Sequence, residues 1–156
     1  MKGEGRAVKV ANRRPGLTFD REGLQEAVRL LDLNAGRFLG GCPAGELSVA
    51  LLSDGALARL HGQFLGDPSP TDVITFAGDT AHGVAGEICV SVDAALRTKG
   101  RARLSGEIML YVVHGWLHLA GYDDARPAAK RSMRRAEARA MRLLARFHAV
   151  PRFMLA

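Results

Sequence analysis

The sequence lacks the apolar segments that a membrane or secreted protein needs. A transmembrane helix requires about 20 consecutive apolar residues, and no uninterrupted run among the 156 residues approaches that length. The N-terminal sequence MKGEGRAVKVANRRPG is basic, but no apolar core follows it, so it does not resemble a secretory signal. We therefore expect a cytoplasmic protein without a membrane span.

Cysteine is scarce, and we find no internal repeat, low-complexity tract or linker. Cys42 and Cys89 show no paired spacing typical of a zinc site, so free thiols in a reducing compartment are expected. With 47% hydrophobic and 24% charged residues, the composition is that of an ordinary globular protein. The length favours a single domain spanning residues 1–156 around one sizeable core.

Acidic residues are almost missing from the C-terminal part of the chain. Residues 1–125 contain 13 lysines and arginines against 15 aspartates and glutamates, whereas residues 126–156 contain nine against one. The net charge of +6 therefore comes from the C-terminal segment. Such a segment is typical of a surface that binds a polyanion such as RNA, but it is equally typical of a solvated helix face.

Hydrophobic periodicity and turn residues predict an α+β fold. Alternating or β-branched segments favour four strands, at 6–12, 46–52, 71–78 and 86–92. Five helices are expected, at about 18–38, 53–64, 93–98, 106–120 and 127–148. Their expected boundary residues are Ser53 and Ser105 as N-caps, Gly66 and Gly121 as helix ends, and Pro127 in the first turn of the last helix. Residues 106–120 are apolar nearly all round, which indicates a buried central helix.

The segment HGWLHLAGYDD at 114–124 is the strongest candidate for a metal site. His114 and His118 are four residues apart, so on a helix they lie on one face with Cβ atoms about 5–6 Å apart. Gly121 can end the helix and let the chain return Asp124, which would complete a two-histidine, one-carboxylate set with an open position. The alternative is a pair of core histidines, but two buried imidazoles would each need a hydrogen-bond partner.

The neighbours of this pair limit the chemistry. In the metalloprotease pattern H-E-x-x-H the glutamate after the first histidine is the general base, and here Gly115 takes that place, which disfavours peptidase activity. Glu107 lies about 10 Å from His114 along the helix, too far to be a ligand, so it is either solvated or hydrogen-bonded near the site. Asp123 could orient a ligand or cap the following turn.

Three segments resemble the YbeY endoribonucleases. Residues 114–123 match the family pattern H-G-x-L-H-L-x-G-Y/F-D-H at every fixed position, and PTDVITF (70–76) and AGEICVS (85–91) are similar to two of its strand motifs, in the same order and spacing. The resemblance covers about residues 46–124. It implies a mixed sheet of about four strands packed with about five helices, and one zinc ion per chain. It also implies cleavage of single-stranded RNA, in maturation of the 3′ end of small-subunit ribosomal RNA and in ribosome quality control.

The resemblance also assigns individual residues. His114 and His118 fall on two family zinc ligands, and Asp124 falls on the third, which is a histidine in the family; a carboxylate binds zinc at about 2.0–2.2 Å. Leu65 falls where the family has an arginine thought to act on the phosphate, and leucine cannot do so. His61, one turn earlier, could compensate or could be an ordinary surface residue. The general base stays unidentified.

In this context the last helix, about 127–148, is expected to contact RNA phosphates. Arg131, Arg134 and Arg135 are the expected contacts, and ribosomal RNA and the small ribosomal subunit are the expected partners. The helix would turn an apolar stripe inward, formed by Met133, Ala136, Ala140, Leu144 and Phe147. Two alternatives stay open: an RNA- or ribosome-binding protein with weakened catalysis, as Leu65 and Asp124 would suggest, and a metal hydrolase of another substrate.

Overall fold

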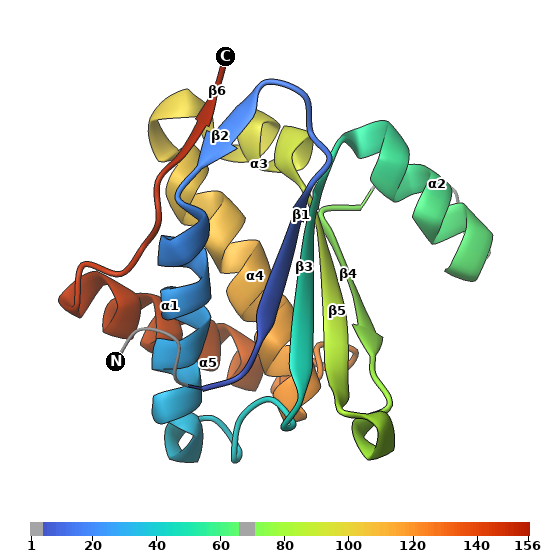
Figure 1. Ribbon diagram of the computed structural model, residues 1–156. Coiled ribbons are helices and arrows are strands. Elements are labelled where there is room, and N and C mark those ends of the chain that lie inside the picture. The colour runs from blue at the N-terminus through green and yellow to red at the C-terminus, as the bar shows by residue number, and fades with distance from the viewer. Residues whose placement is uncertain (1–4, 66–70) are drawn as a thin grey trace.

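The computed structural model describes residues 5–65 and 71–156, apart from the side chain of Leu65 (Figure 1). In chain order the elements are β1 (Val8–Asn12), β2 (Leu17–Phe19), α1 (Arg21–Leu33), the 3-10 helix η1 (Ala35–Arg37), β3 (Glu46–Leu52), α2 (Asp54–Leu65), β4 (Val73–Ala77), η2 (Thr80–His82), β5 (Val84–Ser91), α3 (Val92–Lys99), η3 (Arg101–Arg103), α4 (Leu104–Ala120), α5 (Pro127–Arg146) and β6 (Phe153–Leu155).

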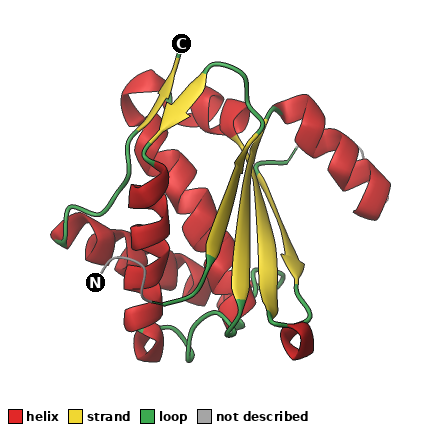
Figure 2. Ribbon diagram, in the orientation of Figure 1, coloured by secondary structure: helices red, strands yellow, loops and turns green. Residues whose placement is uncertain are grey.

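The main sheet has four strands in the order β1-β3-β5-β4. The first three are parallel, and β4 runs antiparallel to β5 at one edge, so the sheet is mixed. Helices α1, α4 and α5 lie on one side of the sheet, whereas α2 stands on the other side (Figures 1 and 2). The expected α+β fold with four strands in a mixed sheet and five helices is confirmed for the described residues. Within these ranges no helix combines the length and the apolarity that a bilayer crossing requires.

Helix α4 lies at the centre of the main core, as its apolar sequence predicts. Its side chains pack against β4 and β5 on one side and against α3 and α5 on the others. Trp116 is fully buried and meets the ring of Phe38 edge-on, with ring centroids 5.5 Å apart. A smaller apolar cluster under α2 contains Leu57, Ile74 and Cys89. Because close packing fixes α4 from several sides, the polar side chains that it carries have defined positions.

Side chains of α1 cover the outer edge of β1. The carbonyl of Ala7 faces β3 and accepts from Leu47 N, whereas the alternate carbonyls face outward. Three α1 side chains spaced four residues apart donate to these outward carbonyls: Arg29 to Arg6 O, Gln25 to Val8 O and Arg21 to Val10 O. Four helical residues rise about 6.0 Å and two strand residues about 6.6 Å, so the two repeats match. Side chains of α1, and not another strand, therefore hydrogen-bond the outward carbonyls of this edge strand.

The expected helix at 18–38 is wrong at both ends. Residues Leu17–Phe19 form strand β2, which pairs antiparallel with β6. Helix α1 begins only after Asp20, whose carboxylate accepts from Gly23 N at 2.9 Å, and it ends at Leu33. The β-branched and aromatic residues Thr18 and Phe19 suit a strand, and their partner strand lies at the opposite end of the chain. No local periodicity could reveal that partner.

Beyond α1, four predicted helix positions are confirmed and two are wrong. Ser53 caps α2 by accepting from Ala56 N at 3.2 Å, and α5 begins at Pro127. Gly121 ends α4 with a φ of 114°, whereas Gly66 and the expected loop at 66–70 lie outside the described residues. Helix α3 falls where a short helix was expected.

Ser105 is not an N-cap, because α4 already begins at Leu104. Its hydroxyl instead accepts from Phe153 N at 2.8 Å and donates to Phe153 O at 3.3 Å, so it holds β6. Helix α5 ends at Arg146 rather than at about His148, and Phe147, expected to point inward, is 56% exposed.

Candidate metal centre

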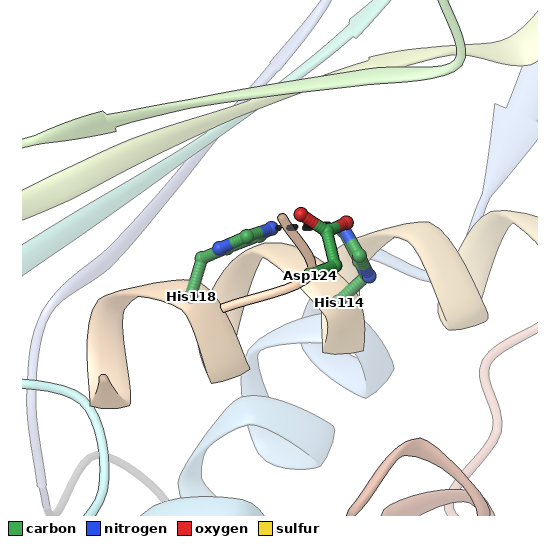
Figure 3. A group of neighbouring side chains, drawn as sticks. All are labelled: His114, His118 and Asp124. Atoms are coloured by element: carbon green, nitrogen blue, oxygen red, sulfur yellow. Dashed lines mark hydrogen bonds and ion pairs between the residues drawn. The ribbon is translucent and has the colours of Figure 1, made fainter. Parts of the chain in front are cut away.

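Three side chains of the segment 114–124 converge at one point. His114 and His118 project from the same face of α4, and Asp124 comes back to them from the loop that follows (Figure 3). The two Nε2 atoms are 3.0 Å apart, and Asp124 Oδ2 lies 3.5 Å from Nε2 of His114 and 3.7 Å from Nε2 of His118. A point equidistant from these atoms lies about 2.0 Å from each, which matches zinc–nitrogen and zinc–oxygen bonds of about 2.0–2.2 Å. The trio therefore has the donor atoms and the spacing for a divalent ion.

The turn after α4 brings Asp124 into place. The left-handed conformation of Gly121 reverses the chain, and Tyr122 N donates to Leu117 O at 3.0 Å. Asp123 then holds the turn, because its Oδ1 accepts from Asp124 N at 2.7 Å and from Ala125 N at 3.1 Å. Of the two roles considered for Asp123, these contacts favour the turn-capping role.

Glu137 of α5 is a part of the site that the sequence reasoning missed. Its Oε2 lies 2.6 Å from Nδ1 of His114, and its side chain is only 6% exposed. Burial opposes its ionisation, but the hydrogen bonds from His114 and Arg134 outweigh burial and hold the pKa of Glu137 below its usual value. An ionised carboxylate only accepts, so Nδ1 of His114 donates to Glu137, and Nε2 is the ring atom that faces His118 and Asp124.

The sequence did contain a signal for Glu137. It is the one acidic residue of the segment 126–156, and it lies beside Met133, Ala136 and Ala140, all of which are buried. A carboxylate on the apolar side of a helix needs a buried partner. Glu107 is likewise buried, at 8% exposure, and it lines a pocket with His114. Of the two alternatives given for Glu107, exposure to solvent is therefore wrong.

Gly115 lets helix α4, which carries both histidines, lie directly on the sheet. A Cβ atom at Gly115 would stand 2.6 Å from Ile88 Cγ2 and 2.9 Å from Thr75 Oγ1, closer than real contacts allow. Gly86 on β5 plays the matching part, since a Cβ there would meet Leu119 Cδ2 at 2.8 Å. A side chain as large as the glutamate of H-E-x-x-H has no room at position 115, which is why a peptidase-type base is absent from that position.

A depression runs along β4 past the trio. A pocket of about 260 Å³ is lined by Val73, Thr75, Ala77, His114, His118 and Leu119. A second pocket, of about 280 Å³, shares Val73 and His114 with the first and adds polar groups: Asp72, Glu107, Tyr111, Asp124, Arg134 and Glu137. A third, of about 370 Å³, continues from Asp72 and Tyr111 to Arg97. Because neighbouring pockets share residues, they lie side by side next to an edge strand, and we call them together the β4 groove.

The expected RNA contacts on α5 differ in their positions. Arg131, Arg134 and Arg135 are all exposed, but of these only Arg134 lines the β4 groove, where its Nη1 donates to Glu137 Oε1 at 2.8 Å. Arg139, on the same basic helix, instead contacts other residues of the protein. Its Nη2 donates to Tyr122 Oη at 3.2 Å, and its guanidinium lies over the ring of Phe38.

Two residues of α2 were considered in connection with the phosphate, Leu65 and His61. Leu65 is the last residue of α2, and its side chain lies outside the described residues. His61 lies on the same helix, and it is not among the described residues that line the pockets next to the trio.

Comparison with known proteins identifies the family. The sequence pattern of the family described as Endoribonuclease YbeY matches residues 11–145. The chain belongs to the YbeY family. Endoribonuclease YbeY of Chlamydia abortus is 42% identical over 115 residues, which cover 67% of this chain and 73% of that protein. Endoribonuclease YbeY of Rhodopirellula baltica is 38% identical over 109 residues, and this chain spans only 56% of its length.

The fold of this YbeY-family chain is also similar to a solved structure. The solution structure of TM1509 from Thermotoga maritima superposes with a TM-score of 0.58 over 91% of this chain and 92% of that one. The two sequences are 24% identical, so the likeness concerns the fold alone.

Proposed function

We propose that this YbeY-family chain is a metal-dependent endoribonuclease that cleaves single-stranded RNA. The observation that carries the proposal is the trio of His114, His118 and Asp124, spaced for one divalent ion and opening on the β4 groove. The relatives are named endoribonucleases. The resemblance of residues 114–124 to the YbeY sequence pattern supports the same assignment, because it implies metal ligands at His114, His118 and Asp124. We expect one ion per chain, with zinc as the candidate because nitrogen and carboxylate donors at this spacing suit it.

The residues of this chain have distinct tasks in the proposed reaction. A divalent ion bound by the trio would polarise a phosphoryl oxygen and make a nucleophilic water available near neutral pH. His114, His118 and Asp124 hold it, and Glu137 keeps the proton of His114 on Nδ1 so that Nε2 is free to bind. Tyr111 and Thr75 line the groove beside the trio and bound the space for substrate.

RNA would be held mainly through its phosphates. Arg131, Arg134 and Arg135 lie exposed on α5, next to the helix that carries the histidines. Contacts to phosphate fix the position of a strand without reading its sequence, so they do not select one RNA. Ribosomal RNA at the 3′ end of the small subunit, bound in the cytoplasm by one domain spanning the chain, is the physiological assignment that family membership supports.

A second candidate is an RNA-binding protein with weakened catalysis. The observation that favours it is Asp124, a carboxylate at the position where the YbeY pattern has histidine; it places a negative charge beside the ion and lowers the ion's Lewis acidity. A peptidase is disfavoured by the lack of space at Gly115. Hydrolysis of another substrate is separated from ribonuclease activity by a substrate panel.

The test begins with metal content. The wild type, purified without chelator, should carry about one zinc per chain by elemental mass spectrometry. Asp124→Ala should lose most of it, and Asp124→His should retain it. The wild type should then cleave a single-stranded transcript containing the 3′ end of small-subunit RNA, lose that activity with chelator and regain it with zinc.

Each outcome of this test separates the candidates. Bound zinc without cleavage would favour the RNA-binding candidate, and faster cleavage by Asp124→His than by the wild type would support the weakening role of Asp124. A wild type that binds no zinc or other divalent ion would contradict the ligand assignment.

A further inference from the structure

One buried carboxylate connects the metal trio with a cation. Glu137 uses its two oxygens separately: Oε2 lies 2.6 Å from Nδ1 of His114, and Oε1 lies 2.8 Å from Nη1 of Arg134. The side chain of Glu137 is only 6% exposed, so contacts within the protein fix its position. Both hydrogen bonds are charge-assisted and therefore short and directional. The positions of a metal ligand and of an arginine are thus set by the same group.

Arg134 is the cation closest to the expected position of a substrate. It is the one lysine or arginine among the described residues that line the two pockets adjoining His114. Besides His114 and Tyr111, the other ionisable side chains of the pocket that it lines are the carboxylic acids Asp72, Glu107, Asp124 and Glu137. A phosphate entering this pocket would meet several acidic groups, so binding requires the metal and a positive side chain together.

The guanidinium of Arg134 can accept a phosphate while it contacts Glu137. It carries five N–H groups, and the contact with Glu137 uses Nη1, so donors are left for a phosphoryl oxygen. Its side chain is 57% exposed, whereas that of Glu137 is 6% exposed. Arg134 is therefore anchored at one side and open to the groove, which suits a side chain that holds an anion at a fixed position.

We propose that Arg134 is the catalytic residue that holds the scissile phosphate beside the metal trio. This proposal rests on the proposed ribonuclease function. Glu137 is the positioning residue that fixes Arg134 and His114 relative to each other. In the hydrolysis the water oxygen bonds to phosphorus, and the bond from phosphorus to the leaving ribose oxygen breaks. One proton of water goes to that leaving oxygen and the other to solvent. Negative charge develops on the non-bridging oxygens, where Arg134 donates.

This assignment distinguishes Arg134 from the other arginines of α5. Arg131 and Arg135 are exposed outside the pockets next to His114, so their contribution is to affinity. Arg142 is exposed about two turns further along the same helix, and replacing it changes the net charge by the same amount. Arg142→Gln is therefore a matched control for Arg134→Gln.

The experiment measures kcat, KM and zinc affinity for each variant, with thermal unfolding to verify folding. Arg134→Gln should lower kcat about 100-fold, the usual effect of removing one donor to a developing oxyanion, and should leave zinc affinity within about threefold. Arg134→Lys should restore part of kcat, because an ammonium supplies charge without the planar fork. Glu137→Gln should weaken zinc binding about 10- to 100-fold and also lower kcat. Arg142→Gln should leave kcat within about twofold.

The results that would overturn the proposal are specific. If Arg134→Gln keeps kcat within about threefold of the wild type, or if Arg142→Gln loses as much, Arg134 does not hold the scissile phosphate. If Glu137→Gln binds zinc as the wild type does, Glu137 is not the positioning residue. If the zinc-loaded wild type cleaves no RNA, the proposed function fails separately. In that case the role of Arg134 is tested by measuring zinc-dependent binding of inorganic phosphate. Arg134→Gln should lose this binding and Arg142→Gln should keep it.

Discussion

Gly115 is the residue whose lack of a side chain determines how near α4, with His114 and His118, comes to the sheet. Gly115→Ala would place a Cβ atom 2.6 Å from Ile88 Cγ2, so α4 must shift outward or Ile88 must change conformation. We expect the free energy of unfolding to fall by about 1–3 kcal/mol, as for overpacked cores. Zinc affinity should also fall, because His114 and His118 flank this residue. Urea unfolding and zinc titration measure the two effects.

Gly106 supplies the control for this prediction. It lies in the same helix, and a Cβ atom there would meet nothing within 4 Å. Gly106→Ala should leave stability unchanged or raise it by up to about 1 kcal/mol, because Gly106 lies in the first turn of α4 and alanine gains most in a helix interior. If the two alanine variants were equally stable, the close approach at Gly115 would not limit the packing of α4.

Asp54 should make the stability of the protein sensitive to acid. Arg97 hydrogen-bonds the Asp54 carboxylate, Ser91 Oγ donates to it at 2.6 Å, and together they hold the pKa of Asp54 below its usual value, although burial opposes them. A lowered pKa in the folded state stabilises the fold above the unfolded value of about 3.9. That contribution is lost as the pH falls through the folded pKa.

The corresponding variant is Asp54→Asn. We expect it to be less stable than the wild type near neutral pH, with the difference in free energy of unfolding shrinking as the pH falls below about 4. Urea unfolding at a series of pH values measures this difference. A difference that stays constant down to strongly acidic pH would mean that the charge of Asp54 contributes nothing.

At the level of elements, the row of α1 side chains over β1 should protect an edge strand. Gln25 donates to Val8 O at 2.9 Å, in the middle of the row. Gln25→Ala should lower the free energy of unfolding by about 1 kcal/mol, the net value of a typical hydrogen bond, and leave an edge carbonyl open to another strand. Sedimentation velocity should then detect self-association that rises with concentration. The exposed Gln63 of α2 offers the control variant Gln63→Ala, for which no such change is expected.

The elements that could be predicted from the sequence are those whose signals are local. The four strands of the sheet and the helices α2 to α5 follow from alternation, apolar periodicity and cap residues within a few positions of each end. The short strands β2 and β6 could not be predicted in the same way, because each is stable only through the other, and residues 17 and 155 are far apart in the chain. Ser105 was assigned to a cap for the same reason: its partner, Phe153, belongs to β6.

The same distinction applies to the metal centre. The convergence of His114, His118 and Asp124 could be predicted because their spacing and the helix end at Gly121 lie within one short segment. Glu137 and Arg134 belong to a different helix, and their roles follow from the way α5 packs on α4. Charge patterning singled out α5 as a basic surface without showing which of its side chains turn toward the site.

For the whole molecule, the distribution of charge places a basic surface beside the groove. The basic segment folds into α5, which packs on α4, the helix that carries both histidines. Arg139 donates hydrogen bonds to Tyr122 Oη and Arg37 O, so the basic surface available to a polyanion is smaller than the sequence indicates. In the proposed function, an RNA strand attracted to α5 would be brought close to the β4 groove, which would raise its local concentration at the trio.

Salt dependence tests whether this surface binds RNA phosphates. Each phosphate neutralised on a single strand contributes about −0.7 to the slope of log affinity against log salt concentration. The double variant Arg131→Gln/Arg135→Gln should therefore make the slope shallower by about 1.4, measured by fluorescence anisotropy with a single-stranded oligonucleotide at several salt concentrations. The control Lys9→Gln/Lys99→Gln removes the same charge from β1 and α3 and should leave the slope unchanged. If both double variants changed the slope equally, the net charge of the molecule, and not the exposed face of α5, would govern RNA binding.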